Sequence, residues 1–220
     1  MAKDILVFRD LTIRGKRGDL PKIRAALLDQ VTMPWKHAEE REEEISSGSL
    51  NDDDVIMFSR EQGNGIEAVG LLLWSRGDSY QVTNIVPRDV SELGYEAYNA
   101  ALNDFVERIA KPASHAAGFR IETTPERQSL TDWVSSDVAE ALRRFSVLAN
   151  KSTGSSHPSD RQRWFEFLLA AHGASEKLDA DRLIRWLSEV ENWPEDTAHD
   201  LAIQYELGLD LLKAYDENRM

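Results

Sequence analysis

The stretch FRIETTPERQ at residues 119–128 decides the fold, because strand signals stop within it. Before Pro125, apolar runs of strand length alternate with helical segments, whereas every periodic segment after it has helical spacing. This change predicts an α+β protein with an N-terminal mixed or antiparallel sheet and flanking helices, followed by an all-α C-terminal helical bundle. We therefore expect two domains, residues 1–125 and residues 126–220.

The start of the chain predicts one strand and two helices. The strand covers residues 5–13. Asp19 is suited to cap the first helix, Pro21 favours its first turn, and Pro34 ends it. A second helix at about residues 36–46 is polar around its whole circumference, so it must lie on the surface or be covered by a partner.

Three further strands are predicted at residues 55–59, 66–74 and 80–86, with a tight turn at residues 76–78. Together they indicate an antiparallel meander. The next segment, residues 92–110, has one apolar stripe at helical spacing.

Pro112 is expected to end that helix, and a short strand at residues 119–122 follows. Beyond Pro125 a helix is predicted at residues 135–149. Residues 150–159 have the composition of a linker, and further helices follow to about Asp216.

The bulk composition places limits on function. The chain has 220 residues and no cysteine, which excludes disulfides, thiolate metal sites and cysteine nucleophiles. No apolar run approaches the roughly 18 residues that span a bilayer, and the N-terminus lacks the apolar stretch of a signal peptide. We expect a cytoplasmic protein that does not act at a membrane.

The formal net charge is −13, and the excess of acid is concentrated in two segments. Residues 39–54 carry eight acidic residues and one basic residue, and residues 186–220 carry nine and two. Such surfaces repel a phosphate backbone, so nucleic-acid binding is disfavoured, while a basic protein partner is attracted. The alternative is that both segments are solvated surfaces that confer solubility.

The residues that we expect to bind such a partner are acidic side chains of the first segment and two tryptophans of the second. They are Glu39, Glu40, Glu43, Asp52, Asp53, Asp54, Trp186 and Trp193. Trp164 and Tyr205 extend the aromatic set, which could form a binding surface or instead fill a helical core.

The predicted order of strand, helix, helix, meander, helix, strand and helix over about residues 4–149 resembles that of GNAT-type acyl-CoA acetyltransferases. In those enzymes a Gln/Arg-x-x-Gly-x-Gly/Ala loop holds the pyrophosphate of acetyl-CoA on backbone amides at a helix N-terminus. The resemblance implies acetyl-CoA as cofactor, with Tyr95 or Tyr98 as the acid. It also implies a cofactor-binding set of Val90, Ser91, Gly94 and Tyr95.

The sequence departs from this motif in ways that disfavour a bound diphosphate. Ser91 stands where the family has Gln or Arg, and Glu96 stands where it has the second Gly or Ala. Glu92 adds a further carboxylate beside the expected phosphate position. The late strands that complete the acetyltransferase sheet are replaced by helices.

Glu195 and His199 are four residues apart on a predicted helix and are weak candidate ligands for a divalent metal. The alternative is a first helical turn whose acids favour the helix dipole, followed by an exposed histidine. No Gly-x-Ser-x-Gly elbow, phosphate loop or His-Glu-x-x-His motif is present.

These observations favour a non-catalytic, acidic interaction protein that binds a basic protein partner and needs no cofactor. A bacterial antitoxin or immunity-type inhibitor has a profile of this kind. The alternative is an acyl-CoA-dependent N-acetyltransferase with an atypical pyrophosphate loop.

Overall fold

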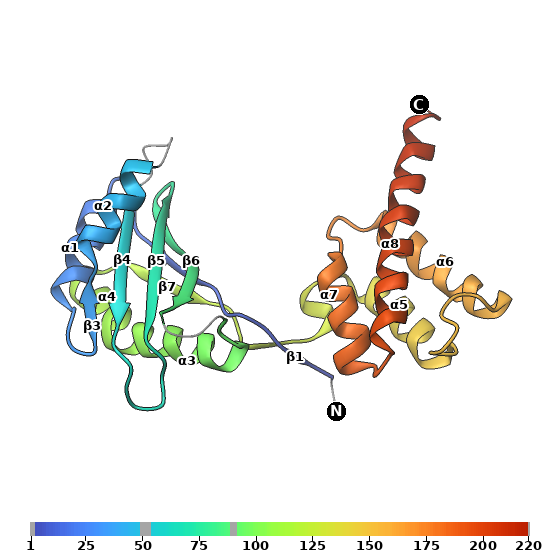
Figure 1. The fold of residues 1–220 in the computed structure, drawn as a ribbon. Coiled ribbons are helices and arrows are strands. Elements are labelled where there is room, and N and C mark those ends of the chain that lie inside the picture. The colour runs from blue at the N-terminus through green and yellow to red at the C-terminus, as the bar shows by residue number, and fades with distance from the viewer. Residues whose placement is uncertain (1–2, 49–53, 89–91, 220) are drawn as a thin grey trace. The chain divides into compact units, whose positions relative to one another are not determined.

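A computed structural model describes residues 3–48, 54–88 and 92–219 (Figure 1). The protein is α+β, as the sequence predicts, and it divides into two compact units. One unit, here called the α+β unit, comprises Val7–Glu126. The other, here called the helical unit, comprises residues 127–219 together with the N-terminal segment that ends at Leu6. The domain that the sequence predicts at residues 1–125 therefore begins at Val7 in the structure, because the segment that ends at Leu6 belongs to the helical unit.

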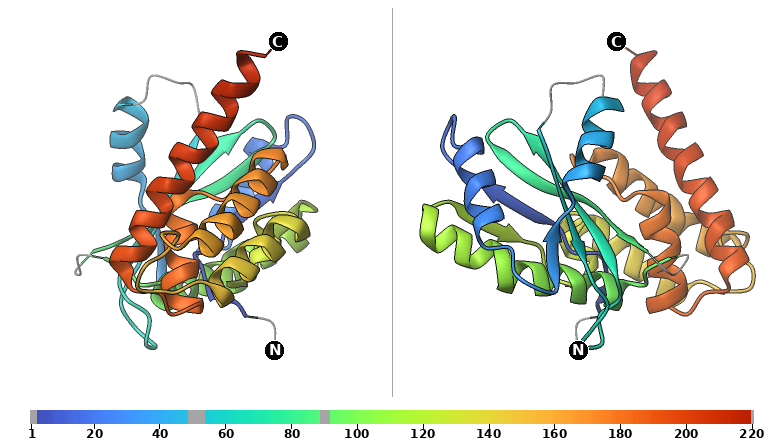
Figure 2. Two further views of the ribbon diagram at one scale, coloured as in Figure 1. Left: turned by 90° about the vertical axis from the view of Figure 1, so that its right-hand side faces the viewer. Right: turned by 60° about the vertical axis from the view of Figure 1, so that its left-hand side comes forward.

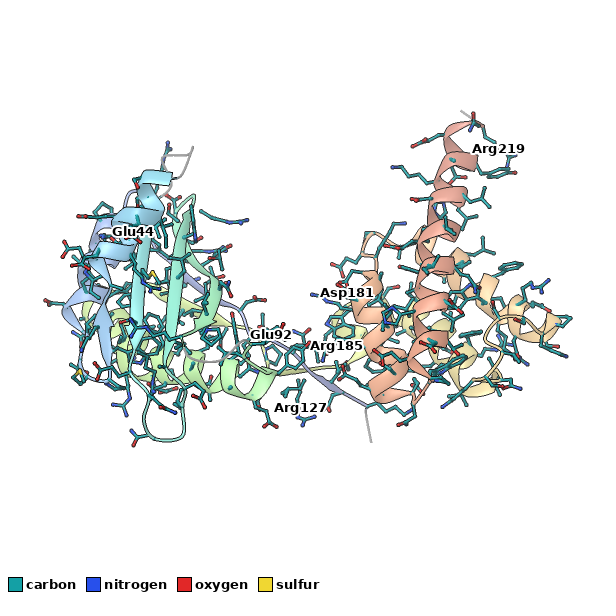
Figure 3. The ribbon with its side chains drawn as sticks, viewed as in Figure 1. Glu44, Glu92, Arg127, Asp181, Arg185 and Arg219 are labelled. Carbon is teal, nitrogen blue, oxygen red and sulfur yellow. The ribbon has the colours of Figure 1, made fainter. Side chains whose placement is uncertain are left out.

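Two short strands place the N-terminus in the helical unit. Strand β1 (Ile5–Leu6) pairs antiparallel with β8 (Arg127–Gln128), with Ile5 opposite Gln128. Arg185 also donates a 2.7 Å hydrogen bond to the carbonyl of Leu6 (Figure 3). The second half is therefore not entirely helical, because it contains this two-stranded ladder.

The prediction of one strand over residues 5–13 is wrong. The structure has β1 and, after a break, β2 (Leu11–Arg14), and the two belong to different sheets. In the break, side chains from other elements take the backbone amides that a neighbouring strand would need. The Arg9 N–H donates to Asn99 Oδ1 at 2.9 Å, and the Asp10 N–H donates to Thr124 Oγ1 at 2.7 Å.

The α+β unit is built on a six-stranded sheet with the order β3-β4-β5-β6-β2-β7, in which every pair is antiparallel. Its central strands are β4 (Val55–Arg60), β5 (Val69–Arg76) and β6 (Ser79–Pro87), which confirms the meander. Gly77, with φ +60°, makes the turn between β5 and β6. The edge strands are β7 (Arg120–Thr123) and β3 (Trp35–His37). The sequence had suggested that β3 lay in a helix.

The helices of this unit are α1 (Leu20–Asp29), α2 (Glu39–Gly48), α3 (Tyr95–Phe105) and α4 (Lys111–Ala117). Successive side chains of β4 and β5 point to opposite faces of the sheet. On one face, Phe58 and Leu71 form a fully buried core with Leu102 and Phe105 of α3. Met57 and Gly70 consequently point to the opposite face of the sheet.

Pro112 does not end the third helix, contrary to the prediction. A π-helical turn, Val106–Ala110, joins α3 to α4, and the chain stays helical until Gly118, which has φ +75°. The turn pairs the Lys111 N–H with the Val106 carbonyl, five residues back. This shifts the hydrogen-bond ladder, so the missing N–H of Pro112 falls in the first turn of α4, where it is tolerated.

The helical unit contains α5 (Ser136–Leu148), α6 (Pro158–Gly173), α7 (Ala180–Arg185) and α8 (Glu195–Glu217). A short 3-10 turn, Leu130–Asp132, precedes α5, and a π-helical turn, Trp186–Val190, follows α7. No helix of the described residues is long and apolar enough to cross a membrane.

Residues 150–159 are not a linker, because they pack on α8 within the helical unit. Ser155 donates a 2.6 Å hydrogen bond to Gln204, and a Cβ on Gly154 would lie 3.4 Å from Thr197. Polar turn residues are as suitable for a compact loop as for a linker, so composition did not separate the two.

A buried guanidinium provides a stability test of the α+β unit. Arg60 is fully buried, its Nε donates to Asp104 at 2.9 Å, and it also donates to three backbone carbonyls. Arg60→Met leaves Asp104 and those carbonyls without their buried donor, so we expect a loss of about 3–5 kcal/mol of unfolding free energy in urea.

Arg108→Met is the matched control, because Arg108 binds the other oxygen of Asp104 from a half-exposed position. It should cost less than about 1 kcal/mol. Equal losses in the two variants would contradict a central role for Arg60.

Candidate functional site

The predicted acidic surface of the first segment is partly present on α2. Glu39, Glu40 and Glu43 are exposed on this helix, and the first two lie in its first turn, where acids complement the helix dipole. Asp54 is used internally, since it accepts hydrogen bonds from Tyr80 and, at 3.2 Å, from Arg24. Asp52 and Asp53 lie outside the described residues.

Glu42, on the same helix, is buried and joins α1, β3 and β4. It accepts from Arg24, from His37 Nε2 at 2.8 Å and from the Met57 N–H at 3.0 Å. Burial raises the pKa of Glu42, but these hydrogen bonds and the Arg24 charge outweigh it and hold the pKa below its ordinary value of 4.5. This carboxylate is structural and not available to a partner.

Trp186 and Trp193 do not form a binding surface, which corrects the prediction. Trp186 is fully buried, edge-on to Trp133 with ring centroids 6.0 Å apart. Trp193 is 4% exposed and stacks on Phe145 at 5.4 Å. Trp164 and Tyr205 are buried in the same way. Large rings from several helices fill one core here, as the alternative had proposed.

The residues that the acetyltransferase resemblance implied are placed near the start of α3. Gly94 is the N-cap of α3 in an extended conformation, and Tyr95 and Tyr98 pack on Phe8 with centroid distances of 4.2 and 4.7 Å. Burial and the nearby Asp10 charge raise the pKa of Tyr98 to about 12. Val90 and Ser91 lie outside the described residues.

A hollow of about 630 Å³ adjoins α3. Asp10 and Glu92 line it, and the described residues around it include no lysine or arginine. A diphosphate placed there would meet two carboxylates and no cation, so these side chains weaken the case for a nucleotide cofactor.

Glu195 and His199 are exposed on the first turns of α8, with 4.0 Å between His199 Nε2 and Glu195 Oε1. Over residues 3–48, 54–88 and 92–219, no group of three or more histidine or acidic side chains is arranged to hold a metal ion. The weak metal candidate therefore gains no additional ligand from the fold.

The feature that the sequence analysis missed is an apolar stripe on α8. The first half of this helix is buried through Ala198, Leu201, Ala202 and Tyr205. Its second half projects from the unit, with α6 in contact along one side (Figures 1 and 2). Four apolar side chains recur along α8 at intervals of four residues and are more than half exposed: Ile203, Leu207, Leu211 and Tyr215.

Helix α6 continues this surface. Leu168 on α6 lies against Gly208 of α8, where a Cβ would come within 2.8 Å of Leu168 Cδ1. Farther along, His172 Nε2 and Asp216 Oδ2 are 2.7 Å apart, so the two helices run in the same direction. With 3.6 residues per turn, the exposed Phe165 and Leu169 of α6 fall on the same side of this seam as Leu211 and Tyr215 of α8.

Carboxylates flank the stripe on α8. They are Asp200, Glu206, Asp210 and Glu217, all exposed, and none forms a salt bridge with another described residue. One nearby cation is already engaged, because Arg219 lies over the Tyr215 ring at 5.3 Å (Figure 3). The stripe, Phe165, Leu169 and these four acids are called the α8 surface below.

A family model described as a domain of unknown function (DUF1889) matches residues 136–206. The match covers α5, α6, α7 and the first half of α8, which is less than half of the chain. It shows what this segment is similar to and carries no activity. No curated protein matches the chain. No solved structure matches it either.

The Glu42 network predicts a pH dependence of stability. Because the pKa of Glu42 is lower in the folded protein, its contribution is present above the unfolded pKa and is lost as pH falls through the folded pKa. Glu42→Gln should therefore lower stability at pH 7 and flatten the decline in acid, measured by urea unfolding between about pH 7 and pH 3.

Glu43→Gln is the control, since Glu43 is an exposed neighbour on α2. It should leave the acid decline unchanged. A decline that Glu42→Gln does not alter would contradict the role assigned to this network.

The hollow beside α3 predicts the outcome of a cofactor test. Addition of about 1 mM acetyl-CoA should not raise the thermal unfolding midpoint, because a ligand stabilises a protein only through binding to the folded state. A clear upward shift would support the acetyltransferase alternative and contradict the electrostatic argument.

Proposed function

We propose that this protein is a non-catalytic binding protein and that the α8 surface takes up a basic, amphipathic helix of a partner protein. One observation carries the proposal. An apolar stripe with four-residue spacing lies exposed on a helix, beside carboxylates that form no salt bridge with another described residue. The apolar stripe requires an apolar face on the partner, and the carboxylates require positive charge beside that face.

The stripe supports recognition of a helix. Burying a leucine side chain contributes about 1.5–3 kcal/mol, and Leu207 and Leu211 are 65% and 71% exposed. An amphipathic helix presents side chains at three- and four-residue intervals, which is the spacing that the α8 stripe offers. A partner helix would therefore cover several of these side chains along one line.

The carboxylates support a partner of positive charge. Asp210 and Glu217 stand beside the stripe without an ion pair in the described part of the chain, and the whole molecule has a net charge of −13. A lysine- or arginine-rich helix would be attracted over a distance of about one Debye length and paired on contact. A second copy of this chain would bring the same acids face to face, which disfavours self-association.

The exposed glutamates of α2, in the α+β unit, also favour a positively charged partner. Glu39, Glu40 and Glu43 add to the negative field that accelerates the encounter with a basic protein. An inhibitor of a basic enzyme or toxin, of the antitoxin or immunity type, is one class of protein that works through such a surface.

The test uses two designed helical peptides with the same leucine spacing, one with lysine and one with glutamate at the polar positions. In fluorescence anisotropy, the full-length protein should bind the leucine–lysine peptide and lose affinity as salt rises from about 0.05 to 0.5 M. Leu211→Ser should weaken binding by about tenfold or more, because one buried leucine is lost. The leucine–glutamate peptide should not bind.

Val147→Ser is the matched control, since Val147 is 68% exposed on α5 and lies outside the α8 surface. It should bind like the wild type. Equal binding of the two peptides, or equal effects of the two substitutions, would refute the proposal. A concentration-dependent dimer in sedimentation equilibrium that Leu211→Ser abolishes would assign the surface to a second copy instead.

A further inference from the structure

A second hollow lies on the sheet of the α+β unit, on the face opposite the core helices. Its volume is about 480 Å³, within the range typical of small-molecule sites. Residues from α2, β4, β5 and the end of β6 line it, and those that carry the argument are Arg41, Met57, Ser59, Gly70, Val86 and Arg88.

The floor of this hollow is apolar, and the Met57 side chain packs over Gly70. Gly70 is the second residue of β5 and pairs with Val86 of β6, and a Cβ on Gly70 would come within 3.0 Å of Met57 Cε. Ala68 and Pro87 extend the apolar lining, and Val86 is 49% exposed although it lies in a strand. An exposed valine beside a strand glycine leaves apolar surface that a small ligand could cover.

The rim carries positive charge that the protein neutralises only in part, since the charge of Arg88, after that of Lys36, helps to lower the pKa of Glu61. Within the described residues, the guanidinium groups of Arg41 and Arg88 have no hydrogen-bond or ion-pair partner. One carboxylate, Glu61, lines the hollow, and it is paired with Lys36.

Two of the hollows of the α+β unit differ in the charge of the side chains that line them. The hollow beside α3 carries Asp10 and Glu92 without a cation among its described residues. The hollow on the sheet carries two arginines and a carboxylate that already has a partner. Of these two hollows, a small anion is favoured at the sheet.

We propose that this hollow binds a small monocarboxylate with a short apolar body. Arginine pairs with a carboxylate through two parallel hydrogen bonds, and the Ser59 hydroxyl offers a further donor beside them. The apolar body would lie over Met57, Gly70 and Val86. The site belongs to a different unit from the α8 surface and does not depend on the function proposed for that surface.

The experiment follows backbone amide signals of the ¹⁵N-labelled full-length protein by NMR. Hexanoate is the test ligand, hexylamine has the same apolar body with the opposite charge, and inorganic phosphate has charge without the apolar body. Hexanoate should cause saturable shifts centred on Met57, Ser59 and Gly70. Hexylamine should cause none there, and phosphate should bind at least tenfold more weakly.

Substitutions locate the site. Arg41→Gln and Arg88→Gln should each weaken hexanoate binding about tenfold, because each removes a charged donor. Ser59→Phe should abolish binding by filling the hollow while both arginines remain. Arg17→Gln, an exposed arginine that does not line the hollow, should bind hexanoate like the wild type. Dispersed spectra of every variant will show that it is folded.

Three results would overturn the proposal. Equal binding of hexanoate and hexylamine would show that charge is not recognised. Phosphate binding as tight as hexanoate would show that the apolar floor has no role. Unchanged affinity in Arg41→Gln and Arg88→Gln would place the ligand elsewhere.

Discussion

The α+β unit depends on one buried charge. Arg60, at the end of β4, donates to Asp104 of α3, to the carbonyls of Glu61 and Gly63, and to that of Ile66. Trp35 of β3 donates to the same carboxylate oxygen of Asp104, at 2.8 Å. An unpaired guanidinium at this position would be very costly, so the edge strand, the loop that follows β4 and the helix are fixed together. The layer of core helices is thereby held to one face of the sheet.

A consequence of that arrangement is the character of the opposite face. The side chains that point into the core are apolar, as at Phe58 and Leu71. The alternate positions, Met57, Ser59 and Gly70, are released from core packing and line a hollow with arginines at its rim. The same period of two that builds the core thus separates the structural surface of the sheet from the surface available to a ligand.

Much of the fold could be predicted because local patterns agree with the tertiary structure. The meander and helix α1 are examples, since strand signals, turn chemistry and the proline in the first helical turn all indicate the same elements. Asp19 occupies the N-cap position of α1, but its side chain accepts from the Lys16 N–H and makes no capping hydrogen bond. The failures occur where a distant residue decides the outcome. Residues 8–10 have strand composition, but side chains of α3 and of the segment after β7 take their amides. The turn before Pro112 changes its hydrogen-bond spacing, which no propensity reports.

The candidate site was harder to predict for a related reason. A tryptophan is favoured both at binding surfaces and in cores, and the sequence left both alternatives open for Trp186 and Trp193. The α8 stripe did have a signal, an apolar residue at every fourth position from Ile203 to Tyr215. What the pattern could not show is which side of α8 the neighbouring helices cover, because that depends on how α6 packs against it.

For the acidic residues too, the sequence gives their number but not which of them are paired in the fold. The chain has 39 acidic residues, and their number alone predicts attraction of a basic partner. Their availability depends on pairing, and the fold divides them. Glu42 and Asp54 are held by Arg24, whereas Asp210 and Glu217 form no salt bridge in the described chain, although Lys213 lies between them on α8. A partner can gain interaction energy only from the second kind, because the first kind is already compensated within the fold. The acidic surface that we propose for partner binding is therefore the one that the fold leaves unpaired next to exposed apolar area, and that combination occurs on α8.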